Sequence, residues 1–411
     1  LSQVERHRNL MVGAEETRYE YDRMNRLTGT LYANGATVRY TYAPNGNRLT
    51  EQGVDPATQA PVDRVYRYNA LNELTAIVNQ ADAAASTRLT YDRNGNNTGS
   101  ETGVYDPSTG LIQAPTASRA FTFDIRDRMV AATATDGSTM AYDYDYEGRR
   151  SRMSGPFANV RFLYDGTDVV QEYTGDTLTT AVKYNYQDGG LLSFVSAGPT
   201  RSSLFYHFDG IGSTSELTDG SGAIRGTYVY DVWGGVRMRA STTGNRRLFT
   251  GQYLDSETGF QDFKARYYDS TTGRFLSPDP VFGDDSNPST LQRYAYAFNN
   301  PTTFADPTGA YDGDFVHAFP GVCVLGVSAE LRFHTWRSAR DTRRARRRSQ
   351  SPPAPLPAAP PPTTADRAVW ARCSPARTRD GPRDTCAAPR PVPARVPAAR
   401  SHAPRRCTSA G

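Results

Sequence analysis

The sequence predicts an all-β protein built from stacked β-hairpins. The first observation behind this prediction is a short aromatic pattern, Tyr-x-Tyr or a close variant, which recurs ten times. The second is that turn-forming Asp, Gly and Asn residues follow most copies. The third is composition, because 25 Tyr stand against only 3 Trp, and Tyr favours strands. The second aromatic of the ten copies lies at positions 21, 42, 68, 91, 123, 144, 164, 186, 208 and 230.

One copy, YTYAPNGNRLT (40–50), shows how a repeat folds. Its two Tyr residues lie on one face of a strand, because side chains alternate with a period of two. The Asn-Gly step tolerates positive φ and forms a turn, and Arg-Leu-Thr then resumes an extended strand. A spacing near 22 residues leaves room for two strands of about six to eight residues and two turns. We therefore expect one hairpin per repeat, stacked into a continuous sheet because a single hairpin is only marginally stable.

Individual residues of the repeat have simple structural interpretations. Tyr stripes with a period of two are more often packing ladders than platforms for stacking sugars or nucleotides. The Asp after each aromatic is more often a turn residue than a calcium ligand. His207 lies in a strand-like YHF, where we expect a structural role. The widest spacing, between positions 91 and 123, contains an insertion at 99–118 that we interpret as a loop on the sheet.

Charge divides the chain into two parts. Residues 1–310 carry a formal net charge of −7, whereas residues 311–411 carry +11. All four Cys lie in the second part without a CxxC pair, so the sequence predicts no metal site, and no P-loop or Rossmann fingerprint indicates a cofactor. No apolar run reaches the roughly 20 residues that span a bilayer. The start, LSQVERHRNL, lacks the apolar core of a signal peptide, and we expect a C-terminal fragment of a longer product.

The repeats and the region after them resemble a known family. The repeat pattern resembles the YD repeats of bacterial Rhs proteins, toxin-complex C proteins and animal teneurins, most specifically in YHFDGIGSTSELTDGSGAIRGTYVYDVWGG (206–235). TGQYLDSETGFQDFKARYYDSTTGRFLSPDP (250–280) and RYAYAFNNPTTFADPTG (293–309) resemble the Rhs repeat-associated core. The resemblance implies hairpins wound in a spiral around a hollow, closed by the core as a plug. It also implies three domains, namely a YD-repeat shell segment at 15–248, the Rhs core at 249–309 and a variable tail at 310–411.

The candidate site is a pair of Asp-Pro steps 27 residues apart, Asp279 in SPDPVFG and Asp306 in ADPTG. Two carboxyl groups held close together cannot both ionise easily, so one can act as an acid and the other as a base in peptide cleavage. In Rhs and toxin-complex C proteins, the motifs that these resemble form an aspartyl-protease-like centre with a nearby Arg. That centre cuts the chain just after the last motif. The resemblance implies Arg266, Asp279 and Asp306 as catalytic residues, with cleavage at Gly309–Ala310 or one bond later.

Other interpretations of this motif remain open. Asp-Pro-x-Gly can be a tight turn and nothing more, because Pro fixes φ and Gly accepts positive φ. Family members commonly carry Leu or Met after the final Gly, where this chain has Ala310. The first motif, DPVFG, also has one residue more than DPxG.

The tail at 310–411 has no alternation and is rich in Arg, Pro and Ala, so we expect it to be disordered. Its basic run RSARDTRRARRRSQ (337–350) would bind polyanions only through charge. A second interpretation is a frameshift after the core, because a GC-rich gene that is read out of frame yields an Arg-, Pro- and Ala-rich sequence without periodicity. In that case the tail has replaced a real effector.

Three classes of function are therefore open. The first is a structural container that releases its C-terminal effector by self-cleavage, with that segment as cargo. The resemblance implies a secretion-system or surface component and an immunity protein as further partners, and a secreted or cell-surface location. The second is a surface adhesion or carbohydrate-binding module that does not cleave itself. The third is non-specific binding of nucleic acid through the Arg-rich tail, with no specific nucleic-acid partner.

Overall fold

The computed structural model is all-β over the residues that it describes, which are 2–9, 13–156, 158–175, 179–187, 190–196, 203–283, 288–310 and 316–317. The chain divides into two units, residues 1–336 and 337–411, and every described residue belongs to the first. The expectations of a disordered tail and of polyanion binding by it concern residues outside the described ones, apart from Ala310, Val316 and His317.

Twenty-one strands form one antiparallel sheet in which each strand pairs with the next along the chain. The strands are β1 (Ser2–Asn9), β2 (Gly13–Tyr21), β3 (Leu27–Leu31), β4 (Thr37–Tyr42), β5 (Arg48–Val54), β6 (Pro61–Tyr68), β7 (Leu74–Asn79), β8 (Ser86–Tyr91), β9 (Asn97–Asp106), β10 (Leu111–Phe123), β11 (Met129–Thr133), β12 (Thr139–Tyr144), β13 (Arg150–Ser154), β14 (Asn159–Asp165), β15 (Asp168–Thr174), β16 (Thr179–Gln187), β17 (Gly190–Ser196), β18 (Ser203–Phe208), β19 (Thr214–Asp219), β20 (Ile224–Tyr230) and β21 (Val236–Ser241). This arrangement confirms one hairpin per repeat and a continuous sheet.

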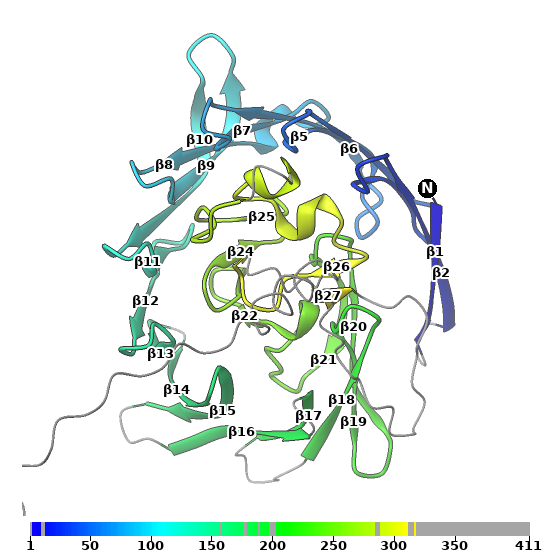
Figure 1. Ribbon diagram of the computed structural model, residues 1–411, viewed down its shortest axis with the longest axis vertical. Helices are drawn as coiled ribbons and strands as arrows, with labels where there is room; N and C mark the ends of the chain where they lie inside the picture. Colours follow the sequence, from blue (N-terminus) through cyan, green and yellow to red (C-terminus); the bar gives the residue numbers. More distant parts are fainter. Residues whose placement is uncertain are drawn as a thin grey trace, which may run out of the picture. The chain divides into compact units, whose positions relative to one another are not determined.

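The sheet bends around the residues that follow it (Figure 1). Its two ends are β1 and β21, and no pairing joins these two strands in the described part of the chain. A closed shell is therefore not seen. What the structure shows is a long antiparallel sheet of hairpins whose concave face covers a smaller body.

Most repeats turn through an Asp-centred loop, and Ala43, Asn69 and Gln187 take the Asp position in the other three. In the turn after β12, Asp145 Oδ1 accepts hydrogen bonds from the backbone N–H groups of Glu147, at 3.0 Å, and Arg149, at 2.9 Å. Arg149 Nε then donates to Asp145 Oδ2 at 2.7 Å. Gly148 between them has a φ of +87°, which Gly adopts without steric cost. The Asp of the repeat is thus a turn residue, as the sequence predicts, and the Arg that follows closes the same turn.

A β-bulge accompanies the second aromatic of every copy. The register shifts immediately before residues 21, 42, 68, 91, 123, 144, 164, 186, 208 and 230. A bulge bends its strand and increases the local twist. Ten bulges at equivalent positions therefore give the sheet its regular bend, a feature that the sequence analysis did not predict.

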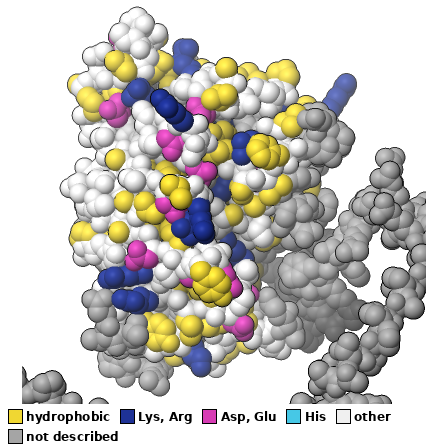
Figure 2. Space-filling model, turned by 60° about the vertical axis from the view of Figure 1, so that its left-hand side comes forward, with side chains coloured by type: hydrophobic (Ala, Val, Ile, Leu, Met, Phe, Trp, Pro, Cys, Tyr) yellow, Lys and Arg dark blue, Asp and Glu magenta, His cyan; other side chains and the backbone are white. Residues whose placement is uncertain are grey.

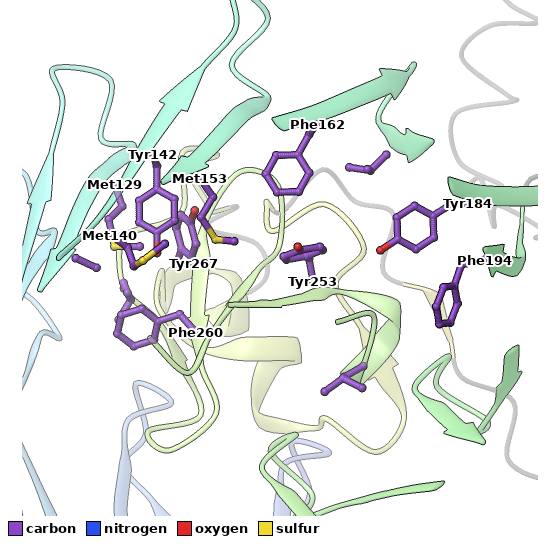
Figure 3. Packing of buried hydrophobic residues seen from close by; sticks show 14 of the residues in the cluster. Met129, Met140, Tyr142, Met153, Phe162, Tyr184, Phe194, Tyr253, Phe260 and Tyr267 are labelled. Atoms are coloured by element: carbon purple, nitrogen blue, oxygen red, sulfur yellow. The ribbon is translucent and has the colours of Figure 1, made fainter. Parts of the chain in front are cut away.

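The aromatic pairs point inward and pack, which confirms the packing ladder. Figure 3 shows Tyr142 and Phe162 of the sheet beside Tyr267 and Tyr253 of the enclosed body, and each pair has a ring-centroid distance of 5.4 Å. The second Tyr of a copy also donates its hydroxyl to a backbone carbonyl of an earlier strand. These bonds run from Tyr42 to Leu27, Tyr68 to Arg48, Tyr144 to Met129, Tyr164 to Arg150, Tyr186 to Val169 and Tyr230 to Thr214, at 2.7–2.9 Å.

The loop predicted at 99–118 is wrong. Apart from the turn at 107–110, those residues belong to the long strands β9 and β10, which pair with each other as an extended hairpin. Asp106 starts the turn between them and accepts from the backbone N–H of Ser108 at 2.8 Å, and Gly110 ends it with a φ of +71°. DPSTG is thus a hairpin turn between strand-forming flanks. Pro115 is tolerated because it lies where the register shifts, between Gln113 and Ala117.

The enclosed body has a small four-stranded sheet and several short helical turns. The strands are β22 (Tyr253–Asp255), β23 (Phe260–Asp262), β24 (Tyr267–Asp269) and β25 (Arg274–Phe275), and a separate pair joins β26 (Phe304–Ala305) to β27 (Val316–His317). The body also contains the 3₁₀ turns η2 (Phe249–Gly251), η3 (Pro288–Leu291) and η4 (Tyr296–Asn299), whereas η1 (Ala83–Ala85) connects β7 to β8 of the large sheet. Phe249, Phe263, Tyr268, Phe275 and Tyr296 form the buried aromatic core of the body.

Buried Arg side chains connect the sheet to this body. Arg150 of β13 donates from Nη1 to both carboxylate oxygens of Asp255, at 2.8 and 2.7 Å, and to the Tyr267 hydroxyl at 3.0 Å. Arg48 of β5 stacks on Trp233 and donates to the carbonyl of Thr272. Because these contacts join positions more than 100 residues apart, they fix the body against the concave face of the sheet.

The outer surface is mixed in character. Figure 2 shows a face on which apolar, basic and acidic side chains are interspersed. Three of the most exposed apolar side chains lie in turns, Ile125 at 98%, Tyr146 at 86% and Leu71 at 70%, and Phe282, at 79%, lies outside a turn after β25. Among the described residues, no helix has the length and apolar character needed to cross a membrane.

Candidate functional site

Arg266 is at the centre of the candidate site. It lies just before β24, where Phe263 N–H donates to the Arg266 carbonyl at 3.0 Å and Lys264 adopts a φ of +68°. This turn directs the guanidinium inward, over the ring of Phe275 at 3.7 Å from the centroid. Only 4% of the residue is exposed. A buried guanidinium needs hydrogen-bond acceptors around it, and the other predicted residues supply them.

Asp279 follows β25 and is held by the chain segment before η4. Its backbone N–H donates to the Arg293 carbonyl at 2.9 Å, and Arg293 Nε donates back to the Asp279 carbonyl at 3.1 Å. One side-chain oxygen, Oδ1, accepts from the Val281 N–H at 2.9 Å. The other, Oδ2, pairs with Arg266 Nη2 at 2.8 Å. These two hydrogen bonds with Arg293 fix the Asp279 backbone, so that its carboxylate contacts the Arg266 guanidinium.

Asp306 follows β26 and begins a tight turn. Its Oδ1 accepts from the backbone N–H groups of Thr308, at 3.2 Å, and Gly309, at 2.8 Å. Its Oδ2 lies 3.4 Å from Arg266 Nη2. Gly309 has a φ of +68°, and a Cβ there would collide with the Phe263 carbonyl. ADPTG is thus the turn that the simpler interpretation predicts, and Asp306 also reaches Arg266.

The same turn presents the Gly309 carbonyl to Arg266, whose Nε donates to it. Arg266 Nη1 completes the set by donating to the Arg293 carbonyl at 2.9 Å. One guanidinium therefore contacts both predicted carboxylates and the carbonyl of the predicted cleavage bond. The structure brings together Arg266, Asp279, Asp306 and Gly309, and Ala310 follows directly. Their catalytic roles stay predictions.

Burial decides the electrostatics of this cluster. Burial raises the pKa of Asp306, and the nearby Asp279 charge adds to that effect. The Arg266 charge and the two backbone N–H bonds oppose it. Burial likewise lowers the pKa of Arg266 to about 10, although both carboxylates favour its charged form. The two carboxylates meet through the guanidinium, and one of them is biased toward its protonated form, as an acid–base pair requires.

The sequence analysis did not identify two residues that complete the site. Arg293 anchors the Asp279 backbone, and Thr308 places its hydroxyl 3.3 Å from the Ala310 nitrogen. Arg293 lies in the core motif RYAYAFNNP and Thr308 within DPTG itself, so the motifs contain both. Neither role is visible in a motif, because each depends on how the turns fold against Arg266.

Two further candidates for chemistry in the described part of the chain are a metal site and His207. No group of three or more His, Cys, Asp or Glu side chains there has the arrangement to hold a metal ion. His207 of β18 is exposed, and its Nε2 shares a hydrogen bond of 2.9 Å with the Thr218 hydroxyl of the adjacent strand.

Residues 2–302 match the family model described as teneurin YD-shell. The chain is 31% identical over 296 residues to a tRNA3(Ser)-specific nuclease WapA of Bacillus spizizenii, covering 70% of this chain and 12% of that protein. It is 30% identical over 295 residues to the tRNA nuclease WapA of Bacillus subtilis, with the same coverage. It is 27% identical over 348 residues to the toxin protein Tse5 of Pseudomonas aeruginosa, covering 71% and 25%. The chain thus spans between about an eighth and a quarter of the length of these relatives.

Among solved structures, the chain resembles a complex described as TcdB2-TccC3-Cdc42. The TM-score is 0.41 at 20% identity, over 72% of this chain and 18% of that one. The family match extends from the first described strand to the residues just before the ADPTG turn. This chain belongs to the teneurin YD-shell family of Rhs-repeat proteins, and is related to the WapA and Rhs toxins.

Proposed function

We propose that this chain is part of the encapsulating shell of an Rhs-type polymorphic toxin and that it cuts its own backbone after Gly309. The observation that carries the proposal is the position of Arg266. Its guanidinium contacts Asp279, Asp306 and the Gly309 carbonyl at once. A structural turn needs none of these contacts to the carbonyl, whereas peptide cleavage needs a group that stabilises the charge developing on that oxygen.

The roles follow from chemistry and position. Arg266 polarises the Gly309 carbonyl, and Asp279 takes a proton from the water that adds to the carbonyl carbon. Asp306, whose pKa burial raises, is the source of the proton for the leaving nitrogen. Because Arg266 contacts the Gly309 oxygen, the geometry favours Gly309–Ala310 over the next bond, which the sequence had left open. The reaction is a single turnover and uses no cofactor.

The shell role is supported by the sheet. Its inner face is lined by aromatic pairs, and its regular bulges bend it around the body that holds the site. In the proposed shell, the sheet continues as a spiral around a hollow, and the core closes that hollow as a plug. The cargo is the segment beyond Gly309, and the further partners are a secretion or surface component and an immunity protein. The location is secreted or at the cell surface.

Pulse-labelled cell-free synthesis tests the cleavage. All six Met residues precede Gly309, so labelled Met reports both the intact chain and the shortened product on an SDS gel. We expect the wild type to shorten, and Asp279→Asn or Asp306→Asn to stay intact. The matched control is Asp269→Asn, a buried carboxyl on β24 that caps a turn at Thr271 and has no contact with Arg266 among the described interactions. Mass spectrometry should place the new C-terminus at Gly309.

A wild type that stays intact at both mildly acidic and neutral pH contradicts the proposal. It would instead favour the adhesion module, which needs no cleavage. Shortening of both Asp variants at the wild-type rate would show that another protease cuts the chain.

A further inference from the structure

The hydroxyl of Thr308 lies within hydrogen-bond reach of both Asp306 and the Ala310 nitrogen. The Ala310 N–H donates to Thr308 Oγ1 at 3.3 Å. Thr308 Oγ1 also lies 3.4 Å from Asp306 Oδ1 and 3.0 Å from the Ala310 carbonyl oxygen. It is thus the described side-chain atom that contacts both an oxygen of the candidate acid and the nitrogen of the bond to be broken.

Asp306 itself is engaged elsewhere. Its Oδ1 accepts from the Gly309 N–H at 2.8 Å, on the near side of the bond, and its Oδ2 faces Arg266. The interactions that the structure shows for Asp306 do not include the Ala310 nitrogen. A carboxylic acid in this position needs an intermediate hydroxyl to reach that nitrogen, and a hydroxyl can donate and accept at the same time.

We propose that Thr308 relays a proton from Asp306 to the Ala310 nitrogen as the Gly309–Ala310 bond breaks, an inference that rests on the proposed self-cleavage. Water adds to the Gly309 carbonyl carbon and leaves its proton on Asp279. As the carbon–nitrogen bond breaks, its electron pair stays on nitrogen and takes the Thr308 hydroxyl proton. Asp306 returns a proton to Thr308 Oγ1. The products are a carboxylic acid at Gly309 and an amine at Ala310, with one water consumed.

The relay requires the hydroxyl rather than the shape of the side chain. Thr308→Val keeps the branched shape and both backbone N–H bonds to Asp306 while removing the hydroxyl. General acid catalysis contributes typically 10²- to 10⁴-fold, so we expect this variant to cleave at least about 100-fold more slowly. Thr308→Ser restores a hydroxyl and should cleave within about 10-fold of the wild type, since a lost methyl perturbs packing only modestly.

The measurement is the half-time of shortening in the pulse-labelled synthesis, in H₂O and in D₂O. We expect the solvent isotope effect of the wild type to change in Thr308→Val, because the number of protons in flight changes. A merely structural Thr308 would leave the isotope effect unchanged. Circular dichroism of the purified variants should show the same strand content and cooperative unfolding.

The outcomes separate the relay from the proposed function. A wild type that never shortens overturns both. A wild type that shortens, with Thr308→Val equally fast, overturns the relay and leaves self-cleavage intact. A Thr308→Ser variant as slow as Thr308→Val also overturns the relay, because shape would then be the cause. A released segment that begins with Tyr311 overturns it too, since Thr308 would face the wrong nitrogen.

Discussion

Arg266 brings one positive charge into contact with two buried carboxylates, Asp279 and Asp306. If both carboxylates were ionised, a net negative charge would stay in a medium that solvates it poorly. Burial raises the pKa of Asp306, which favours a proton on that carboxyl. Lys could not replace Arg266, because one ammonium cannot match the separate acceptors around the planar guanidinium.

Asp231, a half-buried carboxyl at the turn after β20, allows a pH test of stability. Burial raises the pKa of Asp231 to about 6, against lowering by the N–H groups of Gly235 and Trp233. The folded chain therefore binds this proton more tightly than the unfolded chain. The resulting stability is fully present below the unfolded pKa, near 4, and is lost as pH rises through about 6. In the uncleaved Asp279→Asn background, we expect Asp231→Asn to flatten this slope by about 2 kcal/mol between pH 4 and 7.

Urea unfolding followed by circular dichroism across this pH range measures that slope. The control is Asp136→Asn, an exposed turn carboxyl whose pKa is lowered by hydrogen bonds from Ser138. Its contribution is lost only as pH falls below its ordinary value, so the slope between pH 4 and 7 should not change. An unchanged slope in Asp231→Asn would show that this carboxyl does not titrate as described.

The site could be predicted from the sequence only in part. Asp279, Asp306 and Arg266 were predicted through the family resemblance, and in the structure both carboxylates contact the Arg266 guanidinium. Arg293 and Thr308 were not, because an Arg that bonds a backbone carbonyl and a Thr inside a turn look ordinary in sequence. Their roles exist only once 40 residues of chain have folded back onto Arg266.

At the scale of the element, the repeated hydrogen bond from a Tyr hydroxyl distinguishes this sheet from a simple hydrophobic ladder. Six repeats carry the bond, each from the second aromatic to a carbonyl of an earlier strand. It explains why the second position of the pattern is usually Tyr. Phe123 and Phe208 occupy equivalent positions and pack without a hydroxyl, so the ring alone suffices for burial.

We expect Tyr144→Phe and Tyr164→Phe each to destabilise the uncleaved chain by about 1 kcal/mol, because a buried carbonyl loses its donor. The double variant should show nearly additive losses, since each hydroxyl has its own acceptor. Urea midpoints measure the effect. Tyr146→Phe is the control, because this Tyr is 86% exposed and its change should fall within about 0.5 kcal/mol. Losses no larger than about 0.5 kcal/mol in Tyr144→Phe would show that this hydrogen bond does not contribute measurably to stability.

Elements were predicted well where one repeat is enough to specify them. The hairpins, their inward aromatic face and their Asp turns follow from period-two alternation and turn chemistry. The bulges were missed, because a bulge is a property of two paired strands and leaves no mark on either one. The β9–β10 hairpin was missed because its strands, of 10 and 13 residues, are longer than the strands expected in a repeat, so the segment did not resemble its neighbours.

At the scale of the whole described unit, buried charge pairs hold the enclosed body against the sheet. Arg150 is 4% exposed and Asp255 fully buried, and they join β13 to β22. Burial raises the pKa of Asp255 to about 6 even though the Arg150 charge opposes that shift. The Asp255 carboxylate therefore depends mainly on Arg150, with a smaller contribution from the Arg246 charge, to stay ionised at neutral pH.

Arg150→Met should destabilise the uncleaved chain by about 3–5 kcal/mol at neutral pH, because it leaves the Asp255 carboxylate buried and unpaired. We expect one cooperative transition at lower urea, since the sheet and the body share this contact. Arg150→Met combined with Asp255→Asn should cost less than the sum of the single changes. The control, Arg39→Met, removes an exposed surface pair with Glu20 and should change stability by less than about 1 kcal/mol. Two separate transitions in the parent would contradict a shared contact.

The Tyr hydroxyl bonds all point the same way along the chain, from a later strand to an earlier one. A ribosome delivers the earlier strand first, so each new hairpin emerges to find its acceptor already in place. Such a sheet can grow in the direction of synthesis, with each addition closing only a short loop. The ADPTG turn, with Asp306, is then the last part of the site to be made, after Arg266 and Asp279 have emerged. The order of translation would thus keep the proposed cleavage site unassembled until the sheet around it has been made.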